Sequence, residues 1–106
     1  MTNIEDIIAS YGWNIKYNTF NINLNIPFSR QLDELNEDLL QASKETYVID
    51  IGWYPERDPN GKIITVLFEK YNFDKPIAQY KDTNYLYLED HIKYLLNLIK
   101  SKNGGI

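Results

Sequence analysis

The feature that most constrains the fold is an apolar segment, a reverse turn and a second apolar segment within residues 47–69. In Tyr47–Tyr54, apolar side chains fall on both faces of an extended chain, which is typical of a strand in the middle of a sheet. Asp58-Pro59-Asn60-Gly61 has the composition of a type I turn, with the glycine expected in a left-handed conformation. Ile63–Glu69 then returns, so the sequence predicts a central antiparallel hairpin.

Three further segments complete the expected sheet. Trp13–Tyr17 and Phe20–Ile26 alternate apolar with polar residues, and a tight turn near Asn18-Thr19 would join them as a hairpin. Ile77–Lys81 alternates more weakly, and its lysine together with the preceding Pro76 is typical of an edge strand. We therefore expect a mostly antiparallel sheet of about five strands.

Three segments have the periodicity of helices. The first follows a capping box at Thr2–Glu5 and ends before Gly12. The second is expected over Ser29–Lys44, with leucines on one face. The third covers Leu88–Ile99, and the position where it begins is left open. The predicted order is α-β-β-α-β-β-β-α, an α+β fold whose helices cover one face of the sheet in a single domain, residues 1–106.

The chain is acidic, with 15 acidic and 11 basic residues and a net charge of −4. Nucleic-acid binding depends on clustered lysine and arginine, so we expect no direct contact with nucleic acid. A basic protein is a better electrostatic match, although the charge also serves solubility. No apolar run is long enough to cross a membrane and the N-terminus lacks the features of a secretory signal, which favours a cytoplasmic location.

Motifs for catalysis or for cofactor binding are missing from the sequence. The absence of cysteine excludes thiol nucleophiles and thiolate metal sites, and Gly52 and Gly61 are too isolated to form a phosphate-binding loop. His91, the single histidine, has Tyr87 and Tyr94 at helical spacing and is interpreted as structural or solvated. We therefore expect no enzyme activity, no metal, no cofactor and no small-molecule ligand.

Asp50 lies within the apolar central strand, where a carboxylate is costly unless it has a partner. One interpretation makes Asp50 a general acid or base with a raised pKa, in a small carboxylate-dependent hydrolase. The interpretation that we favour places it on the open face of the sheet, bonded to a neighbouring side chain or to a binding partner.

The expected second helix carries four acids, Asp33, Glu34, Glu37 and Asp38. On a helix, the pairs 33/37 and 34/38 would place like charges at i and i+4, which opposes helix formation. A strip of this kind is consistent with a surface that meets a basic partner. The alternative is that acids near a helix N-terminus offset the helix dipole.

The central strand ends in a second candidate surface, residues 50–57. Tyrosine, tryptophan and arginine are the residue types that dominate binding hot spots, and all three occur here. Trp53 shares a face with the strand isoleucines and is expected in the core. The other candidates for partner contact are Asp50, Tyr54, Glu56 and Arg57.

The block YVIDIGWYPE at 47–56, followed by the turn at 58–61, resembles small bacterial toxin-immunity proteins of contact-dependent growth inhibition and related polymorphic toxin systems. Those proteins share a DIGWYPE strand, a DPxG turn, an apolar return strand and an aromatic-x-x-x-Pro loop before a final helix. Phe73-Asp74-Lys75-Pro76 is an approximate match to that loop. The resemblance covers residues 46–100 and does not extend to the first 45.

The resemblance implies stoichiometric binding to the C-terminal domain of a cognate toxin, expected to be a nuclease with a basic active-site cleft. It implies no catalytic residues. Two other functions stay open on the sequence alone: a generic adaptor or oligomerising module that uses its aromatic sheet face, and the hydrolase that would depend on Asp50.

Overall fold

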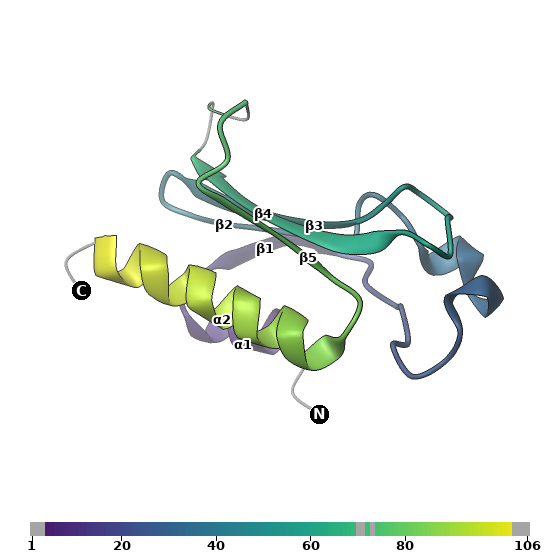
Figure 1. The fold of residues 1–106 in the computed structure, drawn as a ribbon. Coiled ribbons are helices and arrows are strands. Elements are labelled where there is room, and N and C mark those ends of the chain that lie inside the picture. The colour runs from purple at the N-terminus through teal and green to yellow at the C-terminus, as the bar shows by residue number, and fades with distance from the viewer. Residues whose placement is uncertain (1–3, 70–71, 73, 103–106) are drawn as a thin grey trace.

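The computed structural model describes residues 4–69, 72 and 74–102. Within this part of the chain, five strands form one antiparallel sheet in sequential order (Figure 1). Two α-helices lie against the same face of that sheet. The bounds are α1 Ile4–Ser10, β1 Asn14–Asn18, β2 Leu40–Lys44, β3 Tyr47–Tyr54, β4 Lys62–Glu69, β5 Ala78–Asp82 and α2 Tyr85–Lys102. The predicted α+β class and antiparallel sheet are therefore confirmed.

The core lies between the helices and the inner face of the sheet. Strand β3 is the middle strand, and its inner residues pair in register with those of β4: Ile49 with Leu67, Ile51 with Thr65 and Trp53 with Ile63. The inner side chains of β3 are fully buried, which confirms the expected core position of Trp53. Both helices cover them with an isoleucine and leucine stripe: Ile4, Ile7, Ile8, Leu88, Ile92, Leu95, Leu96 and Ile99.

The turn between β3 and β4 forms at the predicted place. The Gly61 amide donates to the Asp58 carbonyl at 2.9 Å, and the Asn60 amide donates to the Asp58 side chain at 2.8 Å. The prediction of a left-handed Gly61 is wrong, since the positive-φ glycine of the described chain is Gly12. Glycine is needed at 61 for space: a Cβ there would lie 2.6 Å from the Trp53 indole nitrogen. That nitrogen donates to the Asp58 carbonyl at 2.7 Å.

The predicted strand over Phe20–Ile26 is wrong, because this segment forms an irregular loop. Its side chains satisfy the backbone locally and so compete with a strand ladder. Asn18 accepts a hydrogen bond from the Phe20 amide, and Asn23 accepts one from the Asn25 amide. Gln31 bonds both the amide and the carbonyl of Asn23 at 2.8 Å.

The predicted helix over Ser29–Lys44 is also wrong. The segment makes two short 3-10 helices, η1 (Phe28–Arg30) and η2 (Leu32–Glu34), and then enters the sheet as β2. Strand β2 pairs along β3 from Leu40 to Lys44, which gives the central strand a partner on its second side. Backbone pairing to β3 therefore overrides a helical pattern that its own like charges already weaken.

The remaining predictions concern element ends. Gly12 follows α1 with a φ of 85°, as expected for a helix stop. Thr2 and Asn3 of the predicted capping box lie outside the described residues. Helix α2 begins earlier than the periodicity indicates, because the Asn84 side chain accepts a hydrogen bond from the Leu86 amide at 2.8 Å and so caps the helix. Strand β5 lies at the sheet edge, as predicted.

Thr65 gives a test of the packing on the inner face. It is fully buried in β4, and its hydroxyl has no hydrogen-bond partner among the described residues. A buried unpaired hydroxyl costs about 1 kcal/mol or more. We therefore expect Thr65→Val, which keeps the β-branched shape, to raise the free energy of unfolding in urea by about 1 kcal/mol.

The matched control is Thr65→Ser, which keeps the hydroxyl and removes a buried methyl group. We expect this variant to unfold at a lower urea concentration than the parent chain. A Thr65→Val protein that is less stable than the parent would show that the hydroxyl is satisfied in solution.

Candidate functional site

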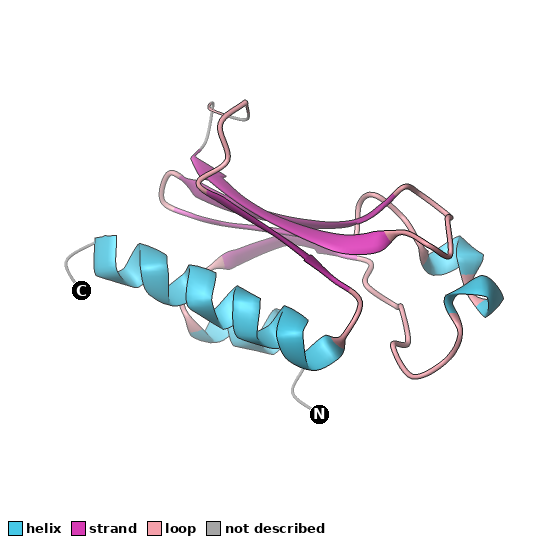
Figure 2. Cartoon of the chain, viewed as in Figure 1, coloured by secondary structure: helices cyan, strands magenta, loops and turns pink. Residues whose placement is uncertain are grey.

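The face of the sheet opposite the helices is the candidate functional site. Neither α1 nor α2 covers it (Figure 2). Asp50 lies near its centre, opposite Gln41 of β2 and Val66 of β4. Tyr17 of β1 lies opposite Gln41 in the next ladder, and Tyr54 at the end of β3 is 39% exposed. The face therefore places a carboxylate on the middle strand between two tyrosines.

Gly52 brings a loop segment onto this face. The Leu39 amide donates to the Ile51 carbonyl at 3.0 Å, and the Trp53 amide donates to the Asn36 carbonyl at 2.8 Å. Between these bonds the backbone of Glu37 passes directly over Gly52, where a Cβ would overlap the Glu37 carbonyl oxygen. The Tyr54 ring also leans over Gly52, since that Cβ would lie 2.8 Å from a Tyr54 ring carbon.

Asp50 is held in a strained electrostatic environment. Its Oδ1 is buried and has no hydrogen-bond partner in the described part of the chain. Burial raises the pKa of the Asp50 carboxyl above its ordinary value of 3.8, and the negative charge of Asp38 raises it further. A hydrogen bond from the Gln41 side chain acts in the opposite direction. The ionised form therefore lacks full compensation in the free protein.

The two flanking tyrosines lie in the electrostatic field of the same acids. Burial, followed by the charges of Asp50 and Asp38, raises the pKa of Tyr17 to about 12. The Tyr17 hydroxyl also donates a long hydrogen bond, 3.5 Å, to Asp38. Burial raises the pKa of Tyr54, and so do the charges of four acids, namely Asp50, Glu37, Asp38 and Glu56. The acids and the tyrosines thus form one cluster, which we call the acidic tyrosine face.

The structure brings together five of the eight residues that the sequence singled out: Glu37, Asp38, Asp50, Tyr54 and Glu56. Asp33 and Glu34 lie in η2, and they are not among the charges that shift the pKa of Asp50 or of either tyrosine. The backbone of Arg57 lies against the residue that follows η2, since its amide donates to the Leu35 carbonyl at 2.8 Å. The expected acidic strip on a helix is therefore wrong, and its second half belongs to the sheet face.

Sequence reasoning missed two members of this face, Tyr17 and Gln41. Tyr17 follows Ile15 on the predicted strand, and that alternation assigned it to the core side. The β1–β2 register shifts between Ile15 and Tyr17, which turns Tyr17 to the open face. Gln41 was assigned to a helix, and its position opposite Asp50 follows only from the β2–β3 pairing.

A second polar cluster joins β5 to α2. The His91 Nδ1 lies 2.9 Å from one carboxylate oxygen of Asp82 and 3.1 Å from the other, and Asp82 is only 6% exposed. The imidazole stacks on the Tyr80 ring at 4.1 Å, and Tyr94 meets Tyr80 edge-on. His91 thus anchors the edge strand to the helix, which agrees with the structural interpretation of this residue.

Within residues 4–69, 72 and 74–102, no group of three histidine, cysteine or carboxylate side chains is close enough to hold a metal ion. No helix in the described part of the chain is both long enough and apolar enough to cross a bilayer.

Comparisons with known proteins add no assignment. No family model matches the chain, and neither a curated protein nor a solved structure matches it.

Because the pKa of Asp50 is raised in the folded state, the fold is expected to lose stability as the pH rises. A carboxyl with a higher pKa in the folded state stabilises the fold while it is protonated, and this contribution is lost as the pH rises from 3.8 through the folded value. We therefore expect Asp50→Asn to melt at a higher temperature than the parent at pH 7.

The same difference in melting temperature is expected to shrink as the pH falls, and to vanish below the ordinary value of 3.8, where both proteins carry a neutral group at this position. Calorimetry of the two proteins from pH 3 to pH 7 measures it. An equal or lower melting temperature for Asp50→Asn at pH 7 would show that the ionised carboxylate is well compensated.

Gly52→Ala tests how the loop segment is held. The new methyl group would meet the backbone of Glu37 rather than a flexible side chain, so we expect a loss of about 2 kcal/mol or more in the free energy of unfolding. We also expect the amide hydrogens of Leu39 and Trp53 to exchange faster, because their hydrogen bonds hold this segment on β3.

Gly61→Ala is the matched control. Its methyl group would crowd the Trp53 indole nitrogen and the Tyr54 carbonyl at the turn, so it also destabilises the protein, but its nearest contacts do not include Glu37. The two variants are compared at equal loss of stability. We expect the Leu39 and Trp53 amide hydrogens to exchange faster in Gly52→Ala only. Equal exchange in both variants would contradict it.

Proposed function

We propose that this chain is an immunity protein, which binds the C-terminal domain of a cognate bacterial toxin and neutralises it by forming a stoichiometric complex. The resemblance in residues 46–100 supports the class. The acidic tyrosine face supports the mode of binding and is the surface that we assign to the partner. The toxin domain would be basic, as expected of a nuclease.

The observation that carries the proposal is the buried Oδ1 of Asp50, which has no hydrogen-bond partner among the described residues and lies on the sheet face that the helices leave uncovered. Its charge opposes folding in the free protein, so its presence needs a reason outside the free fold. A lysine or arginine from a basic partner would give this carboxylate a partner and lower its pKa. The same cation would be attracted by Asp38 and Glu37, which lie beside it.

The tyrosines suit the same partner. Tyr54 is exposed and held against Gly52, so its ring loses little side-chain freedom when a complex forms. Aromatic rings next to carboxylates attract lysine and arginine by both ring and charge. Steering by the acidic field would also speed the first encounter with a basic toxin.

A second candidate function rests on one observation, the raised pKa of Asp50 beside Asp38. Paired carboxyl groups with separated pKa values are typical of acid–base catalysis, so a carboxylate-dependent hydrolase is the alternative. A hydrolase needs no stoichiometric partner, which separates the two functions in a binding experiment. A generic adaptor would bind a protein but would not rescue cells from a toxin.

The experiment that tests the proposal pairs the chain with the C-terminal domain encoded by the neighbouring gene. We expect a one-to-one complex on a sizing column and rescue of growth when both are expressed in one cell. A charge-reversed protein, Glu37→Lys with Asp38→Lys, is expected to bind at least about tenfold more weakly, chiefly through slower association and with less dependence on salt.

The control reverses two exposed acids on the helices, Asp6→Lys with Asp90→Lys, and so changes the net charge equally. We expect it to bind nearly as the parent does. Equal weakening in both proteins would show that only net charge matters and would remove the acidic tyrosine face from the interface. Absence of both complex and rescue would overturn the immunity function itself.

A further inference from the structure

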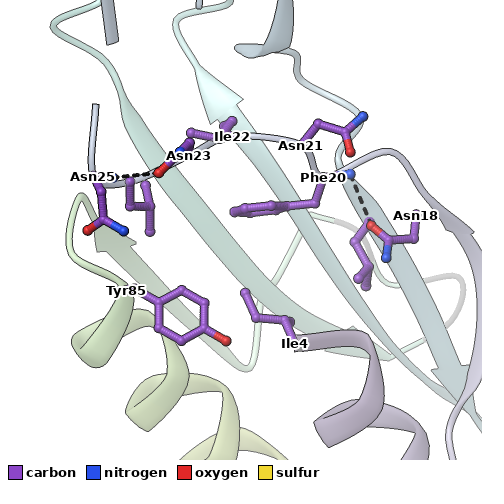
Figure 3. A pocket seen from close by; sticks show the side chains of 10 residues that line it. Ile4, Asn18, Phe20, Asn21, Ile22, Asn23, Asn25 and Tyr85 are labelled. Carbon is purple, nitrogen blue, oxygen red and sulfur yellow. Dashed lines mark hydrogen bonds between the residues drawn. The ribbon is translucent and has the colours of Figure 1, made fainter. Parts of the chain in front are cut away.

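A cavity of about 470 Å³ lies on the helix side of the sheet, away from the acidic tyrosine face. It opens where the irregular 20–25 loop passes over the starts of α1 and α2 (Figure 3). Its size is within the range of sites for small molecules. The loop that roofs it is the segment predicted as a strand, so the cavity exists because that segment leaves the sheet.

The walls of the cavity are largely apolar. Phe20 and Leu24 come from the loop, Leu40 from β2, Ile4 from α1 and Tyr85 from α2. Figure 3 shows the Phe20 ring reaching in from the loop, with Tyr85 and Ile4 rising from the two helices on the other side. Two aromatic rings from opposite walls favour a flat, ring-shaped occupant.

The polar groups of the cavity are neutral. The other lining side chains include four asparagines, Asn18, Asn21, Asn23 and Asn25. No acidic or basic side chain from the described residues lines the cavity. The Glu5 carboxylate next to the cavity already accepts a hydrogen bond from Asn18 at 3.3 Å. A charged ligand would therefore find no charged partner in the lining itself, and burying an unpaired charge is costly. Carboxamides at the mouth can instead donate to and accept from uncharged polar groups.

Some backbone amides of the loop also have no hydrogen-bond acceptor within the described part of the protein. In the described part of the chain, the amides of Asn21, Ile22 and Leu24 donate to no protein acceptor. Ile22 is only 7% exposed, whereas Leu24 is half-buried and Asn21 is exposed. A ligand with a hydrogen-bond acceptor at its edge would find these unpaired amides on the loop that roofs the cavity.

We propose that this cavity is a binding site for a small uncharged aromatic molecule that carries a hydrogen-bond acceptor such as a carboxamide. No sequence motif indicates such a site, and the sequence alone favours a protein that binds no small molecule. The site is independent of the proposed immunity function, because it lies on the other side of the sheet and uses none of the same residues.

The test uses three probes of one shape and different charge: 2-naphthamide, which is neutral, 2-naphthoate, an anion, and 2-naphthamidine, a cation. Each is titrated into the whole ¹⁵N-labelled protein and followed by the amide signals. We expect 2-naphthamide to shift the signals of residues 20–25 and Tyr85 to saturation. The two charged probes are expected to bind at least about tenfold more weakly.

Leu24→Trp, which fills the cavity with a larger side chain, is expected to abolish the saturable shifts. Leu86→Trp, on a residue of α2 that is 70% exposed, is the matched control and keeps them. Phe20→Ala removes one aromatic wall and is expected to weaken binding if Leu24→Trp fails to fold. The absence of saturable shifts, shifts centred on other residues, or equal binding of all three probes would overturn the proposal.

Discussion

The close approach of the Glu37 backbone to Gly52 is the contact on which the acidic tyrosine face depends. The missing side chain lets residues 36–39 lie on β3, where two backbone hydrogen bonds hold them beside Ile51 and Trp53. That placement carries Glu37 and Asp38 to the open face and lets the Tyr54 ring settle beside them. Any side chain at position 52 would push the acids away from Asp50, whatever their charges.

The acids gathered by this contact repel one another and leave Asp50 poorly solvated. A fold selected for stability alone would place an uncharged residue there, since the neighbours Val66 and Gly52 supply no charge in return. The protein therefore holds a carboxylate in a state that a basic partner would improve. Part of the affinity for such a partner would come from relief of a strain already present in the free chain.

Much of the fold could be predicted from residues 47–69, because a strand with apolar side chains on both faces has few other places to lie than the middle of a sheet. The wrongly predicted helix and strand both lie between Phe20 and Lys44. There the alternation of asparagine with apolar residues resembles a strand, but asparagine side chains also bond the local backbone, and those bonds prevail. Further on, the leucine spacing resembles a helix, but the unfilled edge of β3 is the stronger constraint.

The candidate site was predictable only in part, because some of its residues reach the face through contacts that local periodicity does not reveal. Asp50, Tyr54 and Glu56 lie on or beside the correctly predicted strand, so alternation alone assigned them to one face. Tyr17 reaches that face through a register shift, which alternation cannot reveal. Gln41 reaches it through pairing between β2 and β3, a contact that no periodicity in the β2 segment indicates.

The sequential strand order has a consequence for how the molecule assembles. Each strand pairs only with strands next to it along the chain, so the sheet can grow by successive zipping from the β3–β4 hairpin without a long search for distant partners. Among the packed elements, α1 and α2 are the pair farthest apart along the described chain. The central hairpin is thus positioned to act as a nucleus, and docking of the two chain ends completes the structure.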